Sequence, residues 1–76
     1  MTRKDFFGML LLECDIEGEV NENTVCEELE EWDSLSMITI ISIFKTKFNH
    51  TLTIVDVRGC NTFKDILDIA ENYYEK

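Results

Sequence analysis

The residue of this chain that is best placed for chemistry is Ser34, which stands in the tripeptide Asp33-Ser34-Leu35. It follows a long acidic stretch and opens the most apolar segment, so we expect its hydroxyl to lie exposed at the start of a helix. The free N–H groups and the dipole of a helix start favour a phosphate, and a phosphodiester on Ser34 would be stabilised there. Asp and Ser are also preferred N-cap residues. From the tripeptide alone, a helix cap is the simpler interpretation.

Other groups that could do chemistry are scarce. His50 is the only histidine, and an exposed residue in a polar connector is its simplest interpretation. The carboxylates of residues 13–33 stand in an irregular stretch, which is a poor place to hold an acid and a base in fixed geometry. A calcium loop starting at Asp15 fails because Val20 replaces its turn glycine and Cys26 replaces its last carboxylate. We therefore expect no catalytic residues, no metal site and no enzyme.

The charge of the chain excludes several classes of partner. Sixteen acidic residues against seven basic ones give a net charge of −9, and ten of the acidic residues lie between Glu13 and Asp33 with no Lys or Arg among them. Nucleic acids and anionic membranes attract clustered Lys and Arg, so neither is an expected partner. Proteins with basic docking surfaces are favoured, because complementary charge speeds encounter.

Length and cysteine usage point to a small intracellular module. A chain of 76 residues makes one domain, residues 1–76, and leaves little material for a catalytic cleft. The cysteines are three in number and far apart, which argues against a disulfide framework or a zinc site and favours a role as small apolar core residues: Cys14, Cys26 and Cys60. Neither a signal peptide nor a membrane span is expected. The pattern predicts a cytoplasmic monomer.

The elements that must position Ser34 begin with a helix over residues 3–14. Thr2 and Asp5 resemble a capping box at its start, and apolar residues follow at helical spacing. Residues 15–33 then form a long acidic loop. The apolar residues Val25, Leu29 and Trp32 recur in it at i, i+4 and i+7, which predicts that the loop anchors itself through an irregular helical turn.

The segment after Asp33 is predicted to be the main helix. Its apolar residues repeat at i, i+4, i+7 and i+11: Met37, Ile41, Phe44 and Phe48. Its isoleucines are compatible with a strand, but its length, its period and the two lysines near its end favour a helix. Residues 54–60 fit a short strand or a short helix equally well.

A last helix is predicted to begin at Asn61 or Thr62. Its buried face is expected to comprise Phe63, Ile66, Leu67 and Ala70, then Tyr73 or Tyr74. Three substantial helices, a long loop after the first and a short segment before the last predict an all-α fold, a small antiparallel helical bundle.

With this pattern the whole chain resembles the acyl carrier protein family. Asp33-Ser34-Leu35 matches the motif that begins the family's second helix, and Phe48 matches the aromatic residue that ends it. Leu52 matches the apolar residue of the following loop, and Thr62-Phe63 matches the start of helix four, with Ile66, Leu67 and Ile69 on its buried face. From Asp33 onward no gap is needed to align the chain with a typical bacterial member.

The resemblance implies a four-helix bundle in which residues 54–60 form the short third helix. It implies that Ser34 carries 4′-phosphopantetheine derived from coenzyme A, and that Asp33 helps to position metal and phosphate in the complex with a phosphopantetheinyl transferase. It also implies that acyl chains slip between helices two and three. Candidates to line that space, or simply to form ordinary core, are Ile38, Ile41, Ile43, Val57, Cys60 and Ile66.

The partners implied by the resemblance are the transferase, an acyl- or aminoacyl-loading ligase and the downstream enzymes of the pathway. Leu35, Ile38 and Val57 are the expected recognition residues. The chain departs from the family at Glu31-Trp32, where a glycine-containing pair is usual, and in its second helix, which is not acidic. These departures favour a carrier of a specialised fatty-acid- or polyketide-like pathway. An aminoacyl, D-alanyl or peptidyl carrier and an unmodified carrier-like adaptor stay open as alternatives.

Overall fold

The computed structural model describes residues 1–74 as a compact all-α domain with four helices and no strand among those residues. The helices are α1 (Arg3–Glu13), α2 (Ser34–Phe48), α3 (Ile54–Arg58) and α4 (Phe63–Ile69), and two short 3₁₀ turns lie at Cys26–Glu28 (η1) and Glu71–Tyr73 (η2). The predicted fold class is confirmed. Residues 54–60, ambiguous by composition, contain helix α3.

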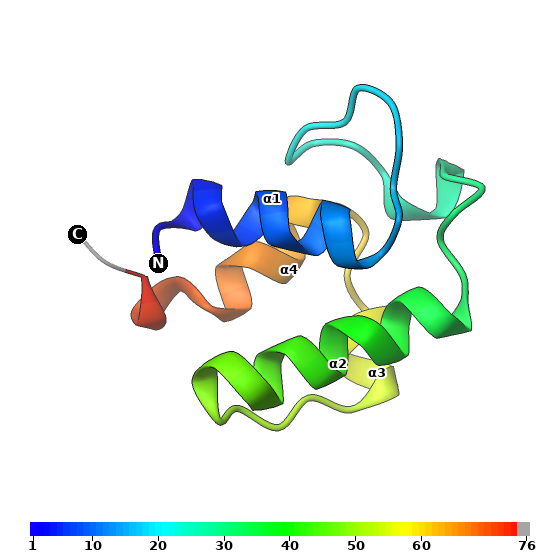
Figure 1. Ribbon diagram of the computed structural model, residues 1–76. Coiled ribbons are helices and arrows are strands. Elements are labelled where there is room, and N and C mark those ends of the chain that lie inside the picture. The colour runs from blue at the N-terminus through cyan, green and yellow to red at the C-terminus, as the bar shows by residue number, and fades with distance from the viewer. Residues whose placement is uncertain (75–76) are drawn as a thin grey trace.

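The four helices form two packed pairs. α1 lies beside α4, the short α3 packs against α2, and the loop of residues 14–33 arches over one end of the bundle before it enters α2 (Figure 1). The core between the pairs is centred on aromatic rings. Phe6 of α1 meets Phe44 of α2 edge to face, with ring centroids 5.3 Å apart, and both side chains are fully buried. None of the helices within residues 1–74 is long and apolar enough to cross a membrane.

Three helices begin with the same device, a threonine followed three residues later by an aspartate. Thr2, Thr53 and Thr62 each accept a hydrogen bond from the backbone N–H of that aspartate, and each aspartate accepts one from the backbone N–H of the threonine. These reciprocal bonds satisfy N–H groups that a helix start leaves free. The box predicted at Thr2 is confirmed, and the cap of the last helix is Thr62.

The last helix is shorter than its apolar pattern suggests. α4 ends at Ile69, and the chain continues through η2. Tyr74 is the tyrosine that packs inward, and its hydroxyl donates a 2.7 Å hydrogen bond to the carbonyl of Leu67. Burial raises the pKa of Tyr74 to about 12. Tyr73 instead stacks on Phe48 at the end of α2, with ring centroids 4.8 Å apart.

Candidate functional site

Ser34 is the first residue of α2, and its side chain is exposed. Asp33 is the N-cap: its carboxylate accepts a 2.9 Å hydrogen bond from the N–H of Ser36. The aspartate therefore performs the capping role, which leaves the Ser34 hydroxyl at the surface beside the helix start. The predicted position of the hydroxyl is confirmed.

Ser36 links the start of α2 to the preceding loop and to the end of α1, a role that the sequence did not predict. It is the one buried polar residue among those the structure describes, with 5 % of its surface exposed. Its hydroxyl donates a 2.7 Å hydrogen bond to the carbonyl of Glu31, and its own carbonyl faces the thiol of Cys14 at 3.8 Å. The start of α2 is thus tied to the preceding loop and to the end of α1. Its signal in the sequence was a small hydroxyl residue two positions into an apolar helix.

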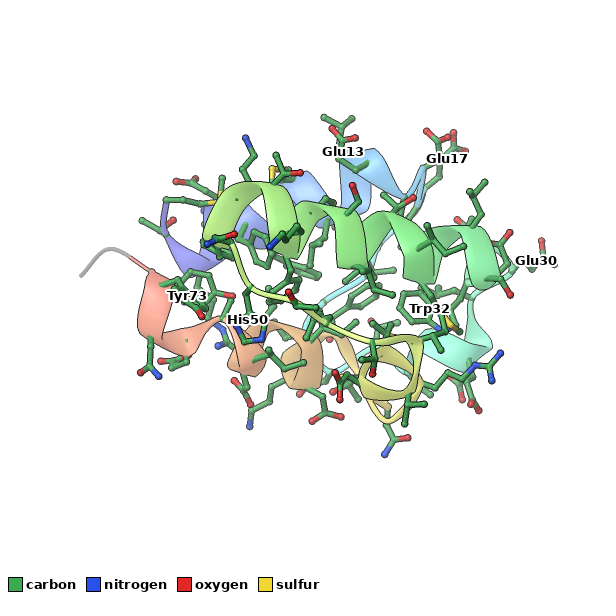
Figure 2. The ribbon with its side chains drawn as sticks, turned by 90° about the horizontal axis from the view of Figure 1, so that it is seen from below. Glu13, Glu17, Glu30, Trp32, His50 and Tyr73 are labelled. Atoms are coloured by element: carbon green, nitrogen blue, oxygen red, sulfur yellow. The ribbon has the colours of Figure 1, made fainter. Side chains whose placement is uncertain are left out.

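The loop before the site is also anchored. The indole of Trp32 lies edge-on against Phe63 at the start of α4, with ring centroids 6.1 Å apart, and it points into the bundle (Figure 2). The Glu31 carboxylate accepts a 3.0 Å hydrogen bond from the N–H of Glu17. The Glu31-Trp32 pair, which departs from the family pattern, therefore fixes the approach to Ser34 by packing and by a hydrogen bond.

The helical turn predicted in this loop is present as the 3₁₀ turn η1, Cys26–Glu28. Cys26 is fully buried, while Val25 is 36 % exposed. The N–H of Cys26 donates to the carbonyl of Asn61 at 2.9 Å, and the N–H of Lys64 donates to the carbonyl of Glu22 at 2.8 Å. Backbone hydrogen bonds to the start of α4 therefore secure the loop as much as its apolar side chains do.

Exposed apolar side chains accompany Ser34 on the surface. Leu35 is 71 % exposed and Ile38 is 56 % exposed, which places both where a partner protein could reach them. Val57, the third expected recognition residue, is only 1 % exposed. Its side chain fills the core and cannot reach a partner, so the prediction that Val57 is a recognition residue is wrong. The exposed apolar residue of α3 is Val55, at 72 %.

The surface next to Ser34 is negatively charged. A pocket of about 250 Å³ lies beside Ser34 and is lined by both of its neighbours in the chain, Asp33 and Leu35. Three further carboxylates line it, from Glu13, Asp15 and Glu31, and no basic residue does. Glu13, Glu17 and Glu30 project outward along this side of the molecule (Figure 2).

The six residues expected between α2 and α3 form mostly closed core. Val57, Ile66, Ile43 and Cys60 are each no more than 9 % exposed, whereas Ile41 is half-buried and Ile38 lies largely in solvent. A second pocket, of about 270 Å³, lies instead between α1 and α2 and is lined in part by Met9 and Ile43. Neither pocket lies between α2 and α3.

The cysteines behave as small core residues, as expected. All three are buried and unpaired. Burial raises the pKa of Cys14 to about 11, with help from the nearby charges of Glu13, Asp15 and Asp33, and burial raises the pKa of Cys26 to about 12. Burial also raises the pKa of Cys60. Thiols held in the protonated form are poor nucleophiles and poor metal ligands.

His50 lies far from Ser34, at the other end of α2. Its ring Nδ1 is 2.8 Å from the hydroxyl of Tyr73, and the two side chains lie side by side (Figure 2). Within residues 1–74 no group of three or more His, Cys, Asp or Glu side chains is arranged to hold a metal ion.

Comparisons of the chain with models of protein families, with curated proteins and with solved structures find no match.

Proposed function

We propose that this protein is a carrier of the acyl carrier type, which holds an acyl group as a thioester on 4′-phosphopantetheine attached to Ser34. The observation that carries the proposal is the exposed Ser34 hydroxyl at the first residue of α2, directly after its cap Asp33. The free N–H groups of that helix start suit a phosphodiester. The four-helix architecture with its long first loop is the setting that the resemblance implies for such a serine.

Attachment of the arm would be performed by a phosphopantetheinyl transferase. The Ser34 oxygen attacks the phosphorus that bears the pantetheine in coenzyme A, and the hydroxyl proton passes to a base of the transferase. The pyrophosphate bond breaks, adenosine 3′,5′-bisphosphate leaves, and a phosphodiester remains on Ser34. Asp33 would add its carboxylate to the metal and phosphate environment of that complex.

The carrier would then work through its arm. The terminal thiol takes the acyl group from an activated donor, such as an acyl adenylate or a coenzyme A thioester, and the leaving group of the donor departs as a thioester forms. A tethered acyl group meets each partner enzyme at a high effective concentration without diffusing away. The reactions belong to the cofactor and to those enzymes. Leu35 and Ile38 supply exposed apolar contacts beside the arm.

An aminoacyl-type cargo is the second candidate. The pocket beside Ser34 is lined by four carboxylates and no basic residue. The negative potential of this face attracts an incoming acyl donor that carries an ammonium group and disfavours an anionic donor. It therefore favours loading with an aminoacyl group within the same carrier mechanism, by a ligase that activates an amino acid.

The proposal is tested by the intact mass of the purified protein before and after incubation with coenzyme A and a broad-specificity phosphopantetheinyl transferase. We expect a gain of one phosphopantetheine, mapped to Ser34 by peptide sequencing. Ser34→Ala should abolish the gain and keep the helical circular dichroism of the parent.

The matched control is Thr51→Ala, which removes an exposed hydroxyl from the loop between α2 and α3 and should be modified like the parent. Absence of any gain in the folded parent, with a reference carrier modified in parallel, would contradict the proposal and favour the unmodified adaptor. Modification of Ser34→Ala would show that another residue is the attachment site.

A further inference from the structure

Two pockets follow one another along the seam between α1 and α2. The first, of about 250 Å³, lies at the Ser34 end, and the second, of about 270 Å³, lies further along the same helices. Glu13 at the end of α1 lines both, so the pockets are neighbours. The second pocket is also lined by Met9 of α1 and by Ile43 and Lys47 of α2. The two adjacent pockets are together called here the α1–α2 groove.

One face of α2 borders the whole groove. The residues that α2 contributes include a series of hydroxyl side chains spaced three or four positions apart, which is the spacing of one helix face: Ser36, Thr39, Ser42 and Thr46. Ser42 and Thr46 are exposed and make no side-chain hydrogen bond within the described part of the chain. The Thr39 hydroxyl donates a hydrogen bond to the carbonyl of Leu35. The hydroxyl oxygen of Thr39 can still accept a hydrogen bond.

The groove begins at Ser34 and has a length suited to a flexible arm. Asp33 and Leu35, the neighbours of Ser34, line its first pocket. Lys47, at its far end, is thirteen residues after Ser34, which corresponds to roughly 20 Å along a helix. An extended phosphopantetheine arm spans a comparable distance, so an arm attached to Ser34 and laid along α2 would end near the second pocket.

The alternative path, between α2 and α3, is filled. Val57 and Ile66 are 1 % exposed and Cys60 is 9 % exposed. Protein cores are close-packed, and room for an acyl chain there would require these side chains to move apart. The α1–α2 groove already has open volume.

We propose that the arm on Ser34 rests in the α1–α2 groove, with its amide groups along the hydroxyl face of α2 and a short acyl group in the second pocket. This inference rests on the proposed function and adds to it the place where the arm and its cargo are held. The arm offers amide N–H donors and carbonyl acceptors, which match the carboxylates of the first pocket and the hydroxyls of Ser42 and Thr46. Met9 and Ile43 supply apolar contacts for the first carbons of the acyl group. The anionic phosphodiester stays at the exposed start of α2, outside the acidic pocket.

The direct test compares amide chemical shifts of the ¹⁵N-labelled protein in three forms: unmodified, with the arm, and with an acetyl or hexanoyl thioester on the arm. We expect the arm to shift resonances of Thr39, Ser42 and Thr46, and the acyl group to shift those of Met9 and Ile43. Shifts confined to residues 54–66 would place the arm between α2 and α3 and overturn the inference. Shifts confined to residues 33–36 would leave the arm in solvent and overturn it equally.

A second test uses the reactivity of the thioester. In the groove the thioester should react with hydroxylamine more slowly than the same acyl group on free pantetheine. Ser42→Trp fills the groove from an exposed position and should bring the rate close to that of the free thioester. The control is Val55→Trp, which adds the same ring at an exposed position on α3 and should keep the parent rate. Equal rates for the parent and free pantetheine would contradict the inference.

The two proposals fail in distinguishable ways. If the transferase adds no mass, the proposed function and this inference both fall. If the arm is added to Ser34 but neither the chemical shifts nor the protection appears, only the groove is wrong. The chemical-shift experiment uses the parent protein, so its outcome does not depend on the stability of Ser42→Trp.

Discussion

We assign the Asp33 carboxylate two roles at different times, as the cap of α2 and as a charged group in the proposed transferase complex. In the free protein its carboxylate oxygen accepts a hydrogen bond from the N–H of Ser36, which caps α2. In the complex with a transferase the same carboxylate is proposed to face metal and phosphate. The first role needs only an oxygen acceptor, whereas the second needs negative charge. Variants that separate acceptor from charge can therefore separate the two roles.

Asp33→Ala should lower the free energy of unfolding by about 1 kcal/mol, because an N-cap is lost. Asp33→Asn keeps an oxygen acceptor and should stay near the parent, as measured by urea denaturation. Both variants should accept phosphopantetheine more slowly than the parent. Loading of Asp33→Asn at the parent rate would show that the charge is dispensable, and equal destabilisation by both changes would show that capping does not explain the effect.

At the scale of elements, the acidic loop is held to the helices by an ion-pair cluster around Arg3. The guanidinium is 2.6 Å from Glu22 of the loop, 2.9 Å from Asp68 of α4 and 2.8 Å from Glu71 of η2. The hydrogen bond with Glu22 is the main reason that the pKa of Arg3 is raised above its ordinary value. One cation thus joins the start of α1 to three acidic residues from distant parts of the chain.

Arg3→Met should lower the free energy of unfolding by up to about 1 kcal/mol, because the cluster is partly exposed and such pairs are screened by water. Added salt should narrow the difference between variant and parent. The control is Lys4→Met, which removes an exposed cation from the same helix and should change stability less. A loss as large for Lys4→Met would indicate that total charge, and not the cluster, determines the effect.

At the scale of the whole molecule, the core protects all of its own thiols. Cys14, Cys26 and Cys60 are buried and their pKa values are raised, whereas the thiol of the proposed arm would lie at the surface of the molecule, in the open α1–α2 groove. The protein therefore provides an internal contrast between protected and reactive sulfur, which can be used as a test of its architecture.

At pH 8 iodoacetamide should label the three cysteines of the native protein far more slowly than those of the protein unfolded in urea. In the protein that carries the phosphopantetheine arm without an acyl group, the arm thiol should react faster than any of the three cysteines, as measured by intact mass. Prompt labelling of a native cysteine would contradict the closed core.

The same pKa shifts predict how stability depends on alkaline pH. The ordinary pKa of a thiol is 9.0, and those of Cys14 and Cys26 in the fold are about 11 and about 12. The folded state holds its protons more tightly, so the stability present below pH 9 should fall as the pH rises from about 9 towards 12. Denaturation midpoints measured between pH 8 and 11 check this, and a midpoint that rises with pH would contradict it.

Local patterns in the sequence predicted α1, α2 and α4, because helix formation depends on neighbouring residues. The period of apolar residues after Asp33 predicted α2, and the Thr-x-x-Asp pattern marked the start of α1 at Thr2. The same pattern at Thr53 and Asp56 could have assigned α3 without the resemblance, since its reciprocal hydrogen bonds involve only residues three positions apart. The exposure of Ser34 also followed from its place at a helix start.

The way in which helix faces and distant segments meet became visible only in the folded molecule. Val57 and Val55 are both valines of one short helix, yet one is buried and the other exposed, because the orientation of α3 depends on its packing against α2. The Arg3 cluster and the α1–α2 groove likewise join residues far apart in the chain. Local patterns carry no information about such pairings, because they arise from the way the helices and the loop fill space together.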